Sequence, residues 1–194
     1  NPKEIEDGFS GILVEYQCEN HGQLINRVEV AKEIMHKSNS INISSGFSSD
    51  ASNRESLWKI RKGLYPTVGA LRKIGTTVIT EDIAVDVQNF SDIVDDMKNI
   101  FESYGFNDAV TFGHAKDGNL HYVCSVDLET SSGVKNYELL IDKMSDITLN
   151  NYNGSLKAEH GTGRNMAPFV EKEWGSEIFD IMWSIKSLSD PDFI

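Results

Sequence analysis

The nine residues GHAKDGNLH, from Gly113 to His121, constrain the fold of this chain more than any other segment. Asp117-Gly118 is a strong signal for a two-residue β-turn, because the favoured turn needs positive φ values that Gly adopts without a Cβ penalty. A turn centred there predicts a hairpin in which His114 lies directly opposite His121. Opposed residues share a face of the hairpin, with Cβ atoms about 5 Å apart. Two imidazoles at that separation can bind one metal ion.

A third candidate ligand lies further along the chain. A histidine pair also occurs on ordinary strand surfaces, and zinc sites usually have three or four ligands. In the segment AEHGTG, from Ala158 to Gly163, Glu159 and His160 stand between short polar and glycine-rich stretches. Glu159 would complete a His-His-Glu set and leave a coordination position open for a substrate oxygen or water. The metal site and the plain hairpin both remain open at this point.

Hydrophobic periodicity predicts alternating strands and amphipathic helices along the rest of the chain. The expected strands are residues 11–18, 76–85, the hairpin 109–126 and 155–160. The expected helices are 24–35, a helix from Ser49 as N-cap to Pro66, 90–104, 134–147 and 174–188. We therefore expect one α+β domain over residues 1–194, with a largely antiparallel sheet and helices on one face, ferredoxin-like in style.

Alternation along the hairpin predicts which face meets the helices. His114 and His121 share one face of the hairpin, and every second residue from Leu120 to Val126 lies on the other. The second face is more continuously apolar, so we expect it to meet the helices.

Composition excludes several classes of function. The 194 residues contain 30 acidic and 18 basic side chains, for a net charge of −12, which argues against nucleic acid as a partner. No apolar run approaches the roughly 20 residues that span a bilayer. Cys18 and Cys124 form no C-x-x-C pair, so the chain lacks an iron-sulfur ligand set and fits a reduced compartment. We expect a cytoplasmic protein, with peripheral association at the inner face of the membrane as an open alternative.

Four segments resemble one family. GHAKDGNLH resembles the metal-binding signature of the FAD-linked oxidase C-terminal domain, and AEHGTG resembles the second signature of that family. The family contains flavoenzymes of the vanillyl-alcohol-oxidase type that oxidise D-2-hydroxy acids such as D-lactate, glycolate and D-2-hydroxyglutarate. KIRKGLYP (59–66) and HGTGRNMAPFV (160–170) are similar to large bacterial members that carry an additional iron-sulfur region. The resemblance covers nearly the whole chain.

The resemblance implies a role for each of six residues. It implies His114, His121 and Glu159 as ligands of a divalent metal, for which zinc suits the donor set and iron or manganese would also be accommodated. It implies His160 as the catalytic base, Arg61 as the holder of the substrate carboxylate, and Asn119 as a substrate-binding residue near the metal. Two of these have plainer readings: Arg61 lies in a cluster of basic residues that is typical of a solvated helix face, and Asn119 is a common turn residue.

The cofactor implied by the resemblance is FAD, which the family binds mainly in a separate N-terminal domain. No G-x-G-x-x-G fingerprint follows a strand in this chain. We therefore expect an excised substrate domain, inactive alone, whose histidine face meets its own FAD-binding domain. An iron-sulfur cluster elsewhere in the full-length protein, an electron acceptor and a homodimer stay open.

The resemblance points to D-2-hydroxyglutarate or D-lactate as the substrate. Hydroxyglutarate dehydrogenases tend to have Asn two positions after the second histidine and Lys in the strand near residue 80. This chain has Val123 and the acidic pair Glu81-Asp82 instead, so the distal charge would come from Arg72, Lys73 or Arg164. Two alternatives are a ligand-binding or regulatory module without catalysis and a structural interaction domain with an incidental histidine pair.

Overall fold

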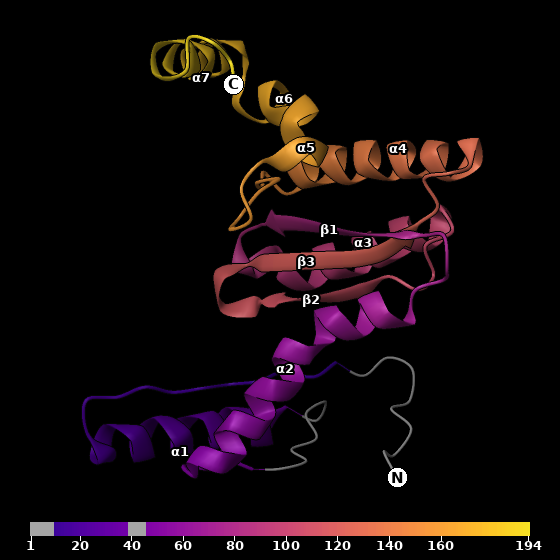
Figure 1. Cartoon of the computed structure of the whole chain (residues 1–194). Helices are drawn as coiled ribbons and strands as arrows, with labels where there is room; N and C mark the ends of the chain where they lie inside the picture. Colours follow the sequence, from indigo (N-terminus) through magenta and orange to yellow (C-terminus); the bar gives the residue numbers. More distant parts are fainter. Residues whose placement is uncertain (1–9, 39–45) are drawn as a thin grey trace. The chain divides into compact units, whose positions relative to one another are not determined.

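The computed structural model describes residues 10–38 and 46–194 (Figure 1). Contacts divide the chain into two compact units, Asn1–Leu64 and Tyr65–Ile194. The first unit contains helix α1 (His21–Lys37) and the start of α2 (Ala51–Leu71), which ends in the second unit. That residues 1–194 act as one substrate and metal domain stays a prediction.

The two helices begin at polar caps. The Asn20 side chain accepts a hydrogen bond from the N–H of Gln23 at 3.0 Å, which starts α1. The Asp50 carboxylate accepts one from the N–H of Asn53 at 2.8 Å at the start of α2. The cap of α2 is therefore Asp50, one residue after the predicted Ser49.

Two predictions for the first 71 residues are wrong. Residues 11–18 form no strand, because a strand needs a ladder partner and the described ranges offer these residues none. Helix α2 does not stop at Pro66 but continues to Leu71. Pro66 removes the donor for the carbonyl of Lys62, yet both residues are exposed, so water can replace that donor.

The second unit is built on a three-stranded antiparallel sheet with the order β1-β3-β2. Its strands are β1 (Thr77–Ala84), β2 (Val110–His114) and β3 (Asn119–Val126). Its longer helices are α3 (Phe90–Ser103), α4 (Ser131–Asp146) and α7 (Ser176–Ser189); the shorter ones are η1 (Val87–Asn89), η2 (Ala115–Asp117), η3 (Ile147–Asn151), α5 (Gly163–Met166), η4 (Ala167–Phe169) and α6 (Val170–Trp174). No helix of the described ranges has the length and apolar character needed to cross a membrane.

The core lies between one face of the sheet and helices α3 and α4. The sheet contributes buried Ile83, Leu120, Tyr122, Cys124 and Val126, and the helices contribute Ile93, Met97, Ile100, Phe101, Leu140, Ile141 and Met144. The rings of Phe101 and Tyr122 stack, with centroids 5.2 Å apart. Each such side chain adds about 1.5–3 kcal/mol on burial. The predicted assignment of the hairpin faces is confirmed, and the histidines lie on the face opposite to these helices.

The α+β class is confirmed, but the last expected strand is not. The order β1-α3-β2-β3-α4 follows the first five elements of a ferredoxin-like fold. Residues 155–160, expected to be a strand, make only one antiparallel bridge, between Ser155 and Ala84. The chain leaves β1 there because its next residues bind the side chains of β1 instead of its backbone, as described below.

Gly118 closes the hairpin and is expected to resist substitution. Its φ is +66°, and an added Cβ would collide with the carbonyl oxygen of Val85, whose N–H donates to the Gly118 carbonyl at 3.0 Å. Gly118→Ala should lower the free energy of unfolding by about 2–4 kcal/mol, from left-handed strain plus the clash. Urea unfolding measures this loss.

A matched control separates strain from collision. Gly105 ends α3 with a φ of +85° and has open space around the position of a Cβ. Gly105→Ala should therefore cost only about 1–2 kcal/mol. Equal losses in the two variants would contradict the collision.

The two cysteines are expected to differ in reactivity. Cys124 is buried, and burial raises the pKa of its thiol to about 12, with nearby Asp108 and Glu81 adding to the shift. Cys18 is half-buried. A thiol reagent at pH 8 should therefore titrate one cysteine in the folded chain and both in urea, since the thiolate is the reactive form. Rapid modification of Cys124 in the folded chain would contradict this prediction.

Candidate metal centre

The hairpin brings the two histidines together in a register that differs from the predicted one. His114 is paired with Asn119, and His121 is paired with Phe112. The connection has four residues, 115–118, instead of a two-residue turn. The register is therefore shifted by two residues, which leaves both histidines on the same face because side chains alternate with a period of two. The two rings are 5.6 Å apart and nearly perpendicular.

Glu159 joins the histidines from the segment that follows Ser155. Its Oε1 atom lies 3.0 Å from Nε2 of His121 and 3.2 Å from Nε2 of His114. The three ligand atoms lie within 4.8 Å of one another. The side chain of His121 is only 3% exposed, whereas those of His114 and Glu159 are about half exposed, at 48% and 50%. The fold thus assembles the three predicted ligands with one open side; that they bind a metal stays a prediction.

A buried carboxylate that the sequence did not identify as functional supports this set. Asp82, on β1 opposite His121, is fully buried, and its Oδ1 lies 3.3 Å from Nδ1 of His121. Its Oδ2 accepts hydrogen bonds from three consecutive N–H groups, those of Ala158, Glu159 and His160, at 3.0, 2.7 and 2.9 Å. One carboxylate therefore contacts a predicted ligand with each oxygen: the ring of His121 and the backbone of Glu159.

Burial and hydrogen bonding set the charges of this pair. Burial alone would raise the pKa of Asp82, but the N–H groups of His160 and Glu159 and the Asn119 amide outweigh it and hold the pKa below its usual value. Burial lowers the pKa of His121, because desolvation disfavours the imidazolium, although Asp82 opposes the shift. A charged Asp82 beside a neutral imidazole is the arrangement of a carboxylate that orients a metal-binding histidine.

His160, the predicted base, lies beside the ligand set. Its ring stacks on that of His121, with centroids 4.6 Å apart and planes 8° from parallel. Its Nε2 lies 3.8 Å from Oε1 of Glu159, and its side chain is 42% exposed. Asp82, His121 and His160 form a second group whose ligand atoms lie within 4.8 Å. Because Asp82 is occupied by hydrogen bonds, the group with Glu159 is the better candidate for a metal site.

The remaining two predicted site residues lie in different surroundings. The amide of Asn119 is buried and donates to Oδ1 of Asp82 at 2.6 Å and to the carbonyl of Ile83 at 3.1 Å. Asn119 thus contacts the carboxylate that binds the backbone of residues 158–160, and its role in binding substrate stays a prediction. Arg61 is half-buried on α2 in the first unit, and its role also stays a prediction.

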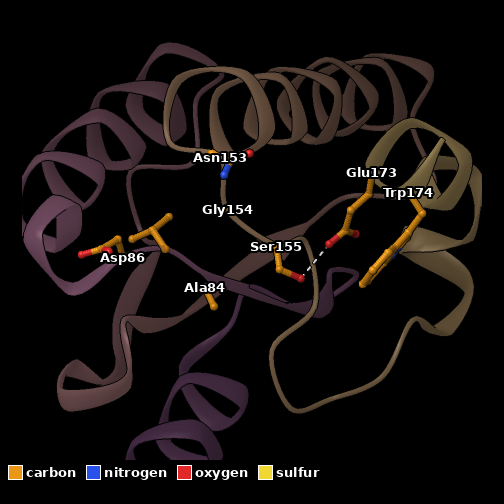
Figure 2. Close-up of a pocket in the computed structure, with 8 residues that line it drawn as sticks. Ala84, Asp86, Asn153, Gly154, Ser155, Glu173 and Trp174 are labelled. Carbon is orange, nitrogen blue, oxygen red and sulfur yellow. Dashed lines mark hydrogen bonds between the residues drawn. The ribbon is translucent and has the colours of Figure 1, made fainter.

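A separate hollow lies at Ser155, where the segment that leads to Glu159 begins. It has a volume of about 370 Å³ and is lined by residues that include Ala84, Asn153, Ser155 and Trp174, but by none of the predicted site residues (Figure 2). Within it the Glu173 carboxylate accepts hydrogen bonds from the Ser155 hydroxyl at 2.6 Å and from the N–H of Leu156 at 3.1 Å. The hollow is shallow, and its acid is used to fix the start of the segment that carries Glu159.

Comparison with known proteins finds several relatives. The chain is 28% identical over 141 residues to glycolate oxidase subunit GlcD of Bacillus subtilis, covering 73% of this chain and 30% of that protein. It is 26% identical over 197 residues to D-lactate dehydrogenase of Anaerostipes hadrus, covering all of this chain and 40% of that protein. It is 31% identical over 144 residues to the mitochondrial D-2-hydroxyglutarate dehydrogenase of Danio rerio, covering 73% of this chain and 25% of that protein.

The chain therefore spans well under half the length of these relatives. Residues 5–194 match the family described as FAD linked oxidases, C-terminal domain. A match over nearly the whole chain shows the family that the two signatures indicated. This chain belongs to the FAD linked oxidases, as a C-terminal domain of that family.

Proposed function

We propose that the chain is the substrate- and metal-binding part of an FAD-dependent dehydrogenase that oxidises a D-2-hydroxy acid, D-2-hydroxyglutarate or D-lactate, to the 2-oxo acid. The observation that supports this most directly is the meeting of His114, His121 and Glu159 at one carboxylate oxygen. The relatives named as D-lactate and D-2-hydroxyglutarate dehydrogenases support the substrate class.

The residues present fit a divalent metal. Two imidazole nitrogens and one carboxylate oxygen form a donor set that suits zinc and also accommodates iron or manganese. Asp82, 3.3 Å from Nδ1 of His121, would fix the ring with Nε2 directed at the ion. A bound divalent ion would act as a Lewis acid that lowers the pKa of the substrate hydroxyl. The half-exposed side of the cluster, at His114 and Glu159, leaves a direction from which that hydroxyl can approach.

In this proposal His160 would take the hydroxyl proton. Its ring is fixed by stacking on His121, and its backbone N–H is bound by Asp82. Its Nε2, beside Glu159 Oε1, would accept the proton, because imidazole is the side chain that most often acts as a general base. FAD, held mainly by a separate domain, would supply the acceptor for the hydride from C2 of the substrate.

Two further roles complete the proposal. Arg61 would hold the substrate carboxylate, for which a guanidinium fork suits bidentate contact. This role rests on the resemblance of residues 59–66 to the family. Asn119 would act mainly by holding Asp82, since both of its side-chain hydrogen bonds are to β1.

Anaerobic flavin reduction in the complete protein tests the proposal. D-2-hydroxyglutarate, D-lactate and glycolate are titrated with metal bound and after chelation, with the L enantiomers of the first two as controls. We expect bleaching of the flavin by one D acid, and loss of the bleaching after chelation. If none of the acids bleaches the flavin while FAD and metal are both bound, the dehydrogenase proposal is wrong and a ligand-binding module takes its place.

A further inference from the structure

A second buried carboxylate lies next to Asp82 on β1. Glu81 is 2% exposed and is paired across the sheet with Tyr122, so its side chain lies on the face that α3 and α4 cover. Its neighbours on that face of β1 are Ile79 and Ile83. A charge among apolar side chains is costly unless it is paired and hydrogen-bonded. The partners of Glu81 therefore indicate its role.

Two of the three partners of Glu81 flank the residues proposed for metal binding and catalysis. Its Oε2 accepts from Nζ of Lys157 at 2.9 Å, and its Oε1 accepts from the Asn165 amide, also at 2.9 Å. Lys157 precedes Glu159 by two residues, and Asn165 follows His160 by five. The third partner, the Tyr137 hydroxyl on α4, donates to Oε1 at 3.2 Å and lies outside that segment.

The acidic pair therefore holds one segment from both faces of the sheet. Asp82 binds the backbone of residues 158–160 on the histidine face, and Glu81 binds the side chains of Lys157 and Asn165 on the helix face. In the described part of the chain β1 is an edge strand, and the Ala84–Ser155 bridge brings the segment to that edge. The segment thus passes around β1, held at both ends by Glu81 and in the middle by Asp82.

We infer that Glu81 is a positioning residue for the metal centre: by holding Lys157 and Asn165, it sets where Glu159 and His160 lie. A carboxylate that only stabilised the core would need no partners in that segment. The hydrogen bonds of Asp82 fix the backbone of residues 158–160, and Glu173 with the Ala84–Ser155 bridge fixes the start of the segment. Glu81 adds a contact at Lys157 and, beyond His160, a contact at Asn165. This inference rests on the proposed function, since it assigns Glu81 to the same site.

Glu81→Gln in the complete protein tests the inference through two readouts besides activity. Gln keeps the volume but turns an amide donor towards Lys157. We expect Zn²⁺ affinity to fall about tenfold, as when a group that orients a metal ligand is lost. Hydrogen exchange in the metal-free protein should show reduced protection of the N–H groups of residues 158–160. Lys157→Met should give similar losses, and the double variant should lose little more than either single variant, because both remove the same ion pair.

Two further variants keep the test decisive. Tyr137→Phe removes the third partner of Glu81 and should lower the melting temperature without changing Zn²⁺ affinity or the protection of residues 158–160. Asn165 is exposed, so Asn165→Ala should fold even if Glu81→Gln does not, and should weaken Zn²⁺ binding about threefold.

The outcomes distinguish the role of Glu81 from the proposed function. If Glu81→Gln and Asn165→Ala lower the melting temperature but leave affinity and protection unchanged, Glu81 is only a core anchor and the inference is wrong. If the parent protein binds no metal, the proposed function fails, while the protection of residues 158–160 in the metal-free protein still decides the role of Glu81.

Discussion

Replacing His121 with Ala is expected to lower the affinity of the chain for Zn²⁺ by more than about 100-fold, beyond the loss typical of groups that only orient a ligand. His121 is the one predicted ligand that is almost fully buried, and its two nitrogens face Glu159 at 3.0 Å and Asp82 at 3.3 Å. Its removal takes away a donor and leaves Asp82 with a missing neighbour. Calorimetric titration with Zn²⁺ after complete chelation measures the effect.

The chain offers a matched control for this variant. His36 lies in the last turn of α1, outside both groups of candidate ligands. His36→Ala should leave Zn²⁺ affinity and stoichiometry unchanged. If His121→Ala retained one tightly bound equivalent of Zn²⁺ while folded, the metal would have to bind elsewhere, and the centre described above would be wrong.

Replacing Asp82 with Asn should produce the largest loss of stability, about 4 kcal/mol in the free energy of unfolding. The Asp82 carboxylate is fully buried and accepts hydrogen bonds from three N–H groups and the Asn119 amide. An Asn side chain has the same shape, but its NH₂ group would face either the Asn119 amide or the three backbone N–H groups, which are themselves donors. Charged hydrogen bonds are worth about 1.5–3 kcal/mol each, and a buried group left unpaired adds to the loss.

Urea unfolding of the metal-free chain measures this loss, and Asp96 supplies the comparison. Asp96 is half-buried and accepts one hydrogen bond, from the Tyr152 hydroxyl at 2.7 Å. Asp96→Asn should cost only about 1 kcal/mol. Similar losses for the two variants would show that Asp82 is no more than an ordinary buried acid. In the folded fraction of Asp82→Asn we also expect Zn²⁺ to bind 10- to 100-fold more weakly, roughly the range seen when a group that supports a metal ligand is changed.

The hairpin shows why the sequence predicted that the two histidines share a face but did not predict the exact pairing of the strands. Asp117-Gly118 indicated a turn at the right place, but a turn of two or of four residues is decided by packing, here by the contact of Gly118 with the Val85 carbonyl. The prediction that His114 and His121 share a face holds in either register, because side chains alternate with a period of two and the register shifts by two residues. Helices α3 and α4 were predicted because the spacing of apolar residues along each helix can be read directly from the sequence.

The acidic pair on β1 shows what the sequence could not reveal. In the sequence, Glu81 and Asp82 stood out as an acidic pair where hydroxyglutarate dehydrogenases tend to have Lys, and no role in the site was assigned to them. Their partners after Ser155 lie 76 to 84 residues further along the chain, and those of Asp82 there are backbone N–H groups, which carry no signature in the residue letters. The strand expected over 155–160 is absent for the same reason. Strand propensity does not show that, after Ser155, this segment contacts the side chains of β1 and not the backbone of β1.

The three N–H groups that converge on Asp82 form a concave cradle, the kind of surface that binds free phosphate or other anions in many proteins. Here the anion is covalently attached to the neighbouring strand, so the cradle is filled as soon as the chain folds. The segment that carries Glu159, one of the three proposed metal ligands, is therefore shaped before any ion would bind. Loss and recovery of the ion should then proceed at the pace of ligand exchange, without refolding, and one protein could be stripped and reloaded with different metals.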